Sequence, residues 1–258
     1  MKRWVENRMV LVALFGMSLC TCLAQNSCET GFYTYMRCGG SAAVCFYDGD
    51  YMRMSFQNQY FTKEMMTEEL SYYHVRRRNC FSAFFSHDGF ARYGEFSAKV
   101  GYGRCFGQRV AVALQAVYLL NHAESYASVH SFTVNIASLC RLTDKCALAV
   151  ELYNPVHLHY GVIGGEVIPM QLDLRFLYSI NSQLIACLYA HQTLPGKLDV
   201  GINGIWQPHP NLMLDVNFSN RRLQAGVHVP FRRLIAAVSF QWHYFAGFSP
   251  QCQLLVKF

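Results

Sequence analysis

The sequence predicts an all-β protein, and more narrowly a transmembrane antiparallel β-barrel of about 14 strands, with 12 to 16 allowed. Three observations indicate this fold class. Apolar and polar residues alternate over long stretches, which is the period of a strand with two unlike faces. Hydrophobic residues make up 52% of the chain and charged residues only 15%, with a mean hydropathy of +0.11. After the first residues, no apolar run reaches the ~18 residues that a membrane-spanning helix needs.

The first element in chain order is a secretory signal peptide over residues 1–24. A basic region precedes an apolar core at 9–20, and the small residues Cys22 and Ala24 fit cleavage after Ala24. A lipoprotein signal, with Cys20 or Cys22 as the lipidated residue, fits less well because the preceding residues match a lipobox poorly. We therefore expect export through the Sec pathway to the outer membrane of a Gram-negative cell.

The remaining residues, 25–258, are expected to form one barrel domain, because neither a linker nor a low-complexity segment interrupts them. At about 17 residues for each strand and connection, this length accommodates around 14 strands. The clearest alternating stretches are 93–104, 110–120, 166–179, 197–206, 234–246 and 248–258.

The segments before residue 93 are harder to assign. We expect strands at 51–61, 71–76 and 80–86, and residues 25–50 could hold a further strand at 42–47. The segment 62–70 fits either a short helical turn or an outward loop.

The alternating stretches have one apolar face and one polar face. The apolar face of 110–120 carries no charge, and apolar residues occupy every second place from Phe248 to Phe258. The opposite faces carry possible ion pairs, which are typical of a hydrated barrel interior: Asp173 with Arg175, Glu95 with Lys99, and Lys197 with Asp199. Aromatic residues near strand ends fit the two interfacial girdles of a membrane barrel: Tyr118, Tyr178, Trp206, Trp242 and Tyr244.

The connections fall into two sets that alternate along the chain. Short, turn-rich segments are expected at the periplasmic end, at 106–109, 142–145, 180–183, 208–211 and 230–233. The other set, expected at the outer end, comprises 86–90, 121–125, 154–166, 191–196 and 220–222. The longest connection falls in this outer set, as in other membrane barrels.

Charge and cysteine content exclude two classes of site. The formal charge of +6 is dispersed and only 75–79 is a basic run, so we expect no nucleic-acid partner. The 11 cysteines lack CxxC spacing, so we expect no structural metal and no cofactor. Most cysteines fit the role of small hydrophobes in strands, although Cys140 and Cys146 flank one turn and could form a disulfide.

No constellation of catalytic residues is present in the sequence, so we expect that the protein is not an enzyme. Ser131 and His130 are adjacent in a strand and point to opposite faces. His243 and Ser239 share a face but lie about 13 Å apart at a rise of about 3.3 Å per residue. Neither a G-x-S-x-G motif nor a P-loop occurs.

The segment "NPVHLHYGVIGGE" at 154–166 is the best candidate for a recognition loop. Asn154 and Pro155 end a strand, and His157, His159 and Tyr160 follow in the longest outer connection. The alternative is that this segment only closes a hairpin.

The segment "GFARYGEFSAKVGYGRCFGQRVAVALQAVYLL", the "LYNP" at 152–155 and the terminal "FSPQCQLLVKF" resemble small outer-membrane barrels of Bacteroidota. The resemblance extends to the PorV/PorQ-like, the PorP/SprF-type and the FadL-like barrels. Two departures are the high cysteine content and "GGSAAV" where an "NPA" motif is common. No N-terminal plug like that of the FadL-like barrels is evident.

The resemblance implies two functions. The first is a non-enzymatic partner or scaffold of an outer-membrane secretion or surface-assembly complex, with an outer-membrane protein as its partner. The alternative is a FadL-like channel for small or hydrophobic substrates. The resemblance also implies contact with membrane lipid and lipopolysaccharide, and with the barrel-assembly machinery, for which Phe258 is the expected assembly signal.

Overall fold

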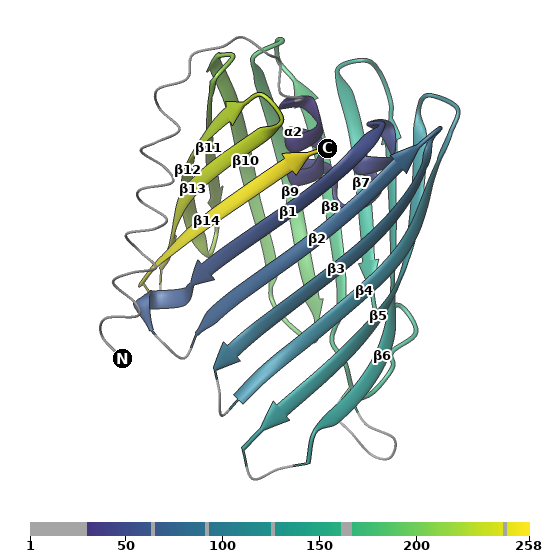
Figure 1. Ribbon diagram of the computed structural model, residues 1–258, viewed down its shortest axis with the longest axis vertical. Helices are drawn as coiled ribbons and strands as arrows, with labels where there is room; N and C mark the ends of the chain where they lie inside the picture. Colours follow the sequence, from purple (N-terminus) through teal and green to yellow (C-terminus); the bar gives the residue numbers. More distant parts are fainter. Residues whose placement is uncertain (1–29, 63–64, 91–92, 125–126, 161–166, 245–246) are drawn as a thin grey trace.

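The computed structural model describes residues 30–258 except 63–64, 91–92, 125–126, 161–166 and 245–246. Within these residues, fourteen antiparallel strands close into one barrel (Figure 1). The strands are β1 (Gly49–Asn58), β2 (Met66–Arg76), β3 (Asn79–Phe90), β4 (Tyr93–Phe106), β5 (Val110–Ala123), β6 (Val129–Arg141), β7 (Cys146–Tyr153), β8 (Met170–Ser179), β9 (Leu184–Leu194), β10 (Leu198–His209), β11 (Leu212–Ser219), β12 (Arg222–Phe231), β13 (Leu234–His243) and β14 (Gly247–Lys257). The predicted fold class and strand number are confirmed.

The last strand is regular to its end because it has a neighbour on each side. β14 pairs with β13 along its whole length and with β1 from Gln251 to Lys257, which closes the ring. The backbone N–H of Phe258 still donates a hydrogen bond of 2.9 Å to the carbonyl of Asp50. A closed ring leaves no free edge, so the terminal strand does not fray.

The two faces of the wall differ as the alternation predicts. On β5, Ala111, Ala113 and Gln115 are buried, whereas Val112 and Leu114 point outward and are exposed. Large apolar side chains on the outer face that are at least half exposed include Val100, Leu114, Phe132, Leu188, Phe218 and Phe240. A soluble monomer rarely exposes so much contiguous apolar surface, so this face needs an apolar environment.

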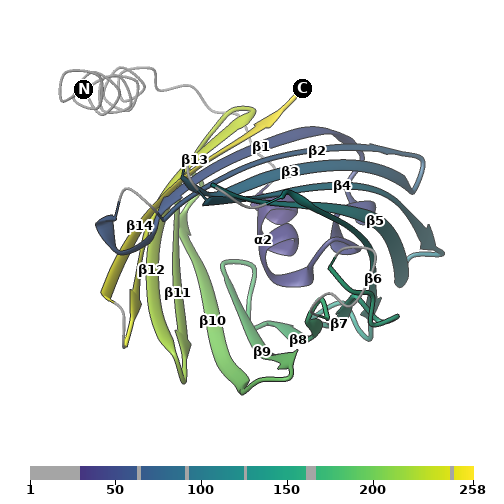
Figure 2. The same ribbon diagram turned by 90° about the horizontal axis from the view of Figure 1, so that it is seen from below.

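A short N-terminal segment fills part of the lumen. The helix α2 (Thr30–Gly39) and the 3-10 helix η2 (Ala43–Phe46) lie inside the ring of strands, as Figure 2 shows from the end of the barrel. We call residues 30–46 the plug. No plug is evident from the sequence, so the structure corrects that expectation, and it also corrects the strand expected at 42–47. Ala42, Ala43 and Val44 are all fully buried, because the plug is surrounded by the wall and not exposed on one face.

Two further boundaries differ from the sequence-based expectation. β2 begins at Met66, so most of 62–70 is neither a helical turn nor an outward loop. β3 continues through 86–90, where its backbone pairs with β4 as far as Tyr93. In both places the neighbouring strand of the hairpin provides backbone hydrogen-bond partners. This pairing outweighs the weak intrinsic strand propensity of these residues. The strands expected at 71–76 and 80–86 are confirmed.

The connections at the end of the barrel where β14 ends, here called the turn end, have two to four residues each. The longest connection, between β7 and β8, lies at the opposite end, here called the loop end. Among the described residues, no helix is both long and apolar enough to cross a membrane.

Candidate functional site

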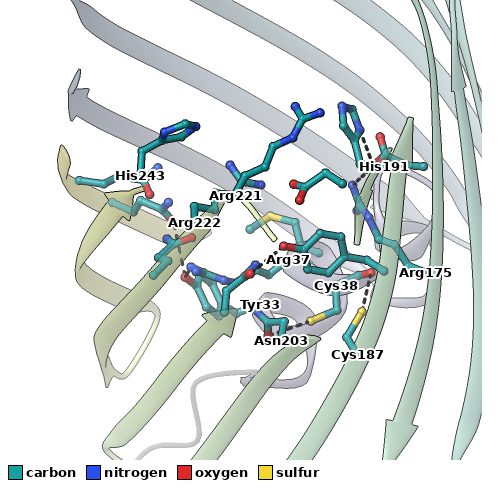
Figure 3. A pocket seen from close by; sticks show the side chains of 18 of the residues that line it. Tyr33, Arg37, Cys38, Arg175, Cys187, His191, Asn203, Arg221, Arg222 and His243 are labelled. Atoms are coloured by element: carbon teal, nitrogen blue, oxygen red, sulfur yellow. Dashed lines mark hydrogen bonds and ion pairs between the residues drawn. The ribbon is translucent and has the colours of Figure 1, made fainter. Parts of the chain in front are cut away.

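The lumen contains two cavities that share no lining residue. The larger, of about 700 Å³, extends from α2 towards the loop end and is lined by residues from β1 and from β8 to β14. We call it the vestibule (Figure 3). The smaller, of about 620 Å³, lies at the turn end and is lined by residues from η2, including Cys45 and Phe46. The plug therefore lies between the two cavities.

Four side chains form a closed ring of polar contacts between α2 and the wall. Arg37 donates to the Asp215 carboxylate at 2.5 Å and to the Tyr33 hydroxyl at 3.2 Å. The Tyr33 hydroxyl lies 2.9 Å from Nδ1 of His228, and Nε2 of His228 contacts the other oxygen of Asp215. A neutral imidazole that accepts from Tyr33 and donates to Asp215 satisfies every member of this ring.

The ring is buried, so it holds the plug in one position. The side chain of Asp215 is 0% exposed and that of His228 is 1% exposed. A carboxylate in such a place is costly unless it is paired and hydrogen-bonded, and here only the plug supplies the arginine. Burial raises the pKa of Tyr33 above its ordinary value, so its hydroxyl stays protonated and available as a donor.

Room for the Asp215 carboxylate comes from the neighbouring strand. Gly226 on β12 lies directly opposite Asp215 on β11. A Cβ at Gly226 would collide with the Asp215 carboxylate and would lie 2.9 Å from Cβ of Ser239. The absence of a side chain at this position therefore lets the acid reach both His228 and Arg37.

Two glycines bring the plug close to the opposite wall where α2 ends. A Cβ at Gly39 would lie 2.8 Å from Cδ1 of Leu139 on β6. Gly40 has φ +71, which side chains rarely adopt, and its Cβ would lie 2.6 Å from a carboxylate oxygen of Glu151. Ser41 donates a hydrogen bond of 3.4 Å to that carboxylate. The pair of glycines thus ends the helix and lets the chain turn against β7.

The vestibule is polar and rich in arginine. Arg37, Arg53, Arg175, Arg221 and Arg222 contribute to its lining, against the two acids Asp173 and Asp199. Three of these arginines have carboxylate partners: Arg37 pairs with Asp215, Arg53 with Glu69 and Arg175 with Asp173. Among the described residues, no ion pair involves Arg221 or Arg222. Amide side chains of Asn203, Asn217, Gln224, Gln251 and Gln253 line the rest of the wall.

Three buried polar atoms of the vestibule lining have no hydrogen-bond partner among the described residues. They are Oδ1 of Asp199, Nε of Arg53 and Nε of Arg222. The guanidinium and amide groups that line the vestibule are hydrogen-bond donors. The lining can therefore hold a molecule that carries both an anionic group and hydroxyl groups.

Of the ion pairs expected inside the barrel, one is present in the structure. Arg175 lies 3.7 Å from Asp173, which also lies 3.0 Å from Nδ1 of His191 on the neighbouring strand. Glu95 instead accepts a hydrogen bond of 3.0 Å from Tyr93, and Lys99 lies over the ring of Phe84. Cys140 and Cys146 are free thiols, and their backbone registers place neither opposite the other.

The expected recognition loop is held at its base by Asn154. This residue is fully buried with φ +51, and its amide oxygen accepts from Thr133 at 2.8 Å and from the Leu158 N–H at 3.0 Å. Its amide nitrogen donates to the Ile168 carbonyl at 2.6 Å. Pro155 and Tyr160 are half-buried, whereas His157 and His159 are exposed. Residues 161–166 lie outside the described residues.

The loop residues and Phe258 lie apart from the vestibule lining. None of Asn154, Pro155, His157, His159 and Tyr160 lines the vestibule, and Phe258 is exposed at the turn end. No group of three or more metal-ligating side chains occurs among the described residues. The role expected for the loop and for Phe258 stays a prediction.

The plug and its ring of contacts were not predicted from the sequence. Tyr33 and Arg37 are four residues apart, which places them on one face of a helix, and "CGG" at 38–40 is a typical helix end. A lone arginine in an apolar N-terminal segment is a weak signal of a buried partner. Asp215 gave no signal of its own, because alternation assigns it only to the inner face.

No protein-family model matches the chain, and no curated protein matches it. Among solved structures, the Pseudomonas putida toluene transporter TodX is similar at 10% identity, over 86% of this chain and 94% of that chain, with a TM-score of 0.61. The Ralstonia pickettii toluene transporter TbuX matches at 8% identity, over 90% and 94%, with a TM-score of 0.58. The CymD monoaromatic hydrocarbon channel matches at 9% identity, over 85% and 91%, with a TM-score of 0.62. At these identities, the likeness shows a shared barrel fold.

Proposed function

We propose that the protein is an outer-membrane channel that the plug keeps closed, and that the vestibule binds the solute it admits. The observation that carries this proposal is the position of the plug between two cavities, each at one end of a closed barrel. The neighbours named as transporters and channels share this fold, which adds support for the class but none for the solute.

The outer-membrane location rests on the apolar outer face of the barrel and on the expected signal peptide. In this location, lipid and lipopolysaccharide cover the outer face, and the barrel-assembly machinery inserts the chain. Fractionation of the host cells tests the location. We expect the mature protein in the outer-membrane pellet after a carbonate wash, and its recovery in the soluble fraction would contradict the proposal.

The lining of the vestibule favours a small polar anion, such as a hydroxylated carboxylate, over a hydrocarbon. Hydrocarbon pockets are predominantly apolar, whereas this one is lined by arginines, amides and two tyrosines. Arg221 and Arg222, at the loop end, have no ion pair among the described residues and supply cations for an anionic group. The solute proposed here therefore differs from those named for the similar structures.

Calorimetric titration of the detergent-solubilised barrel tests this solute class. Gluconate serves as the hydroxylated anion, and toluene serves as the hydrocarbon. We expect gluconate to bind with an affinity that falls as salt rises, because the attraction is electrostatic. Arg222→Gln should weaken binding about tenfold or more, a loss of about 1.5–3 kcal/mol for one charged hydrogen bond. Arg232→Gln, at an exposed turn on the opposite end, is the matched control.

Either of two results would contradict the anion: heat from toluene alone, or gluconate binding that Arg222→Gln and Arg232→Gln reduce equally. The channel itself is tested separately by conductance in planar bilayers. We expect rare openings in the wild type and frequent openings when the Arg37–Asp215 contact is removed. A wild type that conducts freely, or a variant that never opens, would contradict a plug that gates the lumen.

A scaffold in an outer-membrane secretion or surface-assembly complex is the second candidate, and the filled lumen favours it as well. A native pull-down from outer membranes distinguishes the two functions. Stable stoichiometric partners together with a barrel that never conducts would favour the scaffold. A lone barrel that conducts would favour the channel.

A further inference from the structure

The cysteines of the barrel interior are distributed in an unusual way. Among the described residues, three cysteines of the wall are buried: Cys80, Cys105 and Cys187. The described part of the plug also contains two buried cysteines, Cys38 and Cys45. Each of the three wall thiols lies beside a plug thiol, and this arrangement joins the plug to two different parts of the barrel.

The first cluster joins α2 to β9. The Cys187 thiol lies 3.9 Å from the Cys38 carbonyl (Figure 3). The two side chains also contact each other. Both residues belong to the wall of the vestibule and are buried in the closed barrel. Asn203 on β10 completes the contact, because its side-chain oxygen lies 3.8 Å from the Cys38 thiol.

The second cluster joins η2 to β4. The Cys105 thiol lies 3.1 Å from the Cys45 carbonyl, and its side chain contacts that of Cys45. Both residues line the cavity at the turn end. Gly103 makes room for Cys45, since a Cβ there would lie 2.6 Å from its sulfur atom. Cys80 on β3 also contacts Cys45 but does not line that cavity.

We propose that Cys38–Cys187 and Cys45–Cys105 are cross-linking sites that close as disulfides and attach the plug covalently to the wall. The inference uses the proposed export only in placing the chain in an oxidising compartment, where such bonds persist. In the structure, all four groups are reduced thiols.

The oxidant is a disulfide compound, which exchanges with each pair in two steps. One protein thiolate attacks a sulfur of the incoming disulfide, forms a mixed disulfide and releases one thiol of the compound. The second protein thiolate then attacks the mixed disulfide at the protein sulfur, which releases the second thiol. Two protein thiols thereby lose two protons and two electrons, and one molecule of the disulfide compound becomes two thiols.

Burial sets the time at which this exchange takes place. Cys38 is 3% exposed and Cys187 is 2% exposed, so a disulfide compound has little access to either sulfur once the barrel has closed. We therefore expect exchange to occur mainly while the chain folds and the thiols are still accessible.

Peptide mapping of the protein isolated from outer membranes tests the inference. The protein is denatured in N-ethylmaleimide, digested without reduction and analysed by mass spectrometry. We expect peptides joined through Cys38–Cys187 and Cys45–Cys105, whereas Cys252, which points outward, is alkylated. Maleimide on both members of a pair, or a pair joined to other partners such as Cys45–Cys80, overturns the inference for that site.

A second measurement separates this inference from the channel and from the location. The same mapping is made on protein folded in detergent with cystine as the disulfide compound, and cell location and conductance play no part in it. In Cys187→Ser, only the second cross-link should remain. Added protease should therefore cleave the plug about twice as fast in Cys187→Ser as in Cys252→Ser. Folding of each variant is checked by heat-modifiable migration. Equal release from the two folded variants overturns a cross-link that holds the plug.

Discussion

At the scale of single residues, the plug depends on one buried carboxylate. Asp215 contacts His228 on the wall and Arg37 on the plug. Of these two partners, Arg37 is the one that links the wall to the plug, and it does so with a formally charged guanidinium group. Tyr33 links the remaining members, so loss of any one group leaves another buried polar atom unpaired. The net free energy gained when such a buried ion pair forms is small, whereas the free energy lost when one partner is removed is large. The ring therefore stabilises one position of the plug mainly because any other position would leave a buried charge unpaired.

Asp215→Asn should therefore loosen the plug. The substitution keeps the size of the side chain but leaves Arg37 without its counter-charge, which costs about 3–5 kcal/mol when one partner of a buried pair is removed. We expect faster cleavage of the plug by added protease and more frequent openings in bilayers. Asp144→Asn, in an exposed turn, is the control and should behave like the wild type. Identical protection of both variants would show that the ring does not hold the plug.

Gly226→Ala tests the same contact without a change of charge. The new methyl group would displace the Asp215 carboxylate, and overpacking of this kind costs about 1–3 kcal/mol. We expect the plug to be released as in Asp215→Asn, but to a smaller extent. Gly204→Ala is the matched control, since a Cβ at this strand glycine meets no atom within 4 Å. If Gly226→Ala and Gly204→Ala release the plug to the same extent, the cause is the loss of a strand glycine and not the collision of the new methyl group with Asp215.

At the scale of secondary-structure elements, alternation predicted the strands well and the plug not at all. The strands β4, β5, β8, β10, β13 and β14 were identifiable because each alternates between an outer and an inner face, as Val112 and Gln115 show on β5. The plug has no such contrast. Its apolar residues Ala42, Ala43 and Val44 are buried on every side, so their short run has the same appearance as a buried strand.

The contacts of the site could not be predicted, because they join segments that are far apart in the sequence. Arg37 and Asp215 are separated by 178 residues, and only closure of the barrel brings them together. The sequence alone contains no information that pairs them. The expected recognition loop was recognisable as a loop, whereas the burial of Asn154 beneath it was not.

The loop from β7 to β8 yields an element-scale prediction. Asn154→Ala removes the hydrogen bonds to Thr133, Leu158 and Ile168, and alanine tolerates the left-handed backbone less well than asparagine. We expect faster proteolysis at 156–160 while the barrel keeps its heat-modifiable migration. Asn220→Ala, at the same end of the barrel, is the control. An unfolded barrel would show that Asn154 supports the wall, and unchanged proteolysis would show that it does not order the loop.

At the scale of the whole molecule, the chain is organised inside out relative to a soluble protein. Polar and charged groups are gathered around the plug in the lumen, and large apolar side chains cover the outside. This distribution explains the low content of charged residues together with the positive mean hydropathy. It also explains why no long apolar run is needed, because each strand contributes only every second residue to the outer face.

The depth of each outward residue in a bilayer yields the last prediction. Val238 is 47% exposed at the centre of β13, whereas Val110 is 36% exposed at the turn end of β5. On the lipid face of a barrel, arginine costs about 2–4 kcal/mol at the midplane and about 0–1 kcal/mol near the interface. We therefore expect Val238→Arg to lower the free energy of unfolding in lipid vesicles by at least twice as much as Val110→Arg. In a barrel surrounded by water, both arginines would be solvated at little cost. Equal and small losses for the two variants would therefore contradict a membrane-embedded barrel, and a larger loss for Val110→Arg would place the membrane at a different height along the strands.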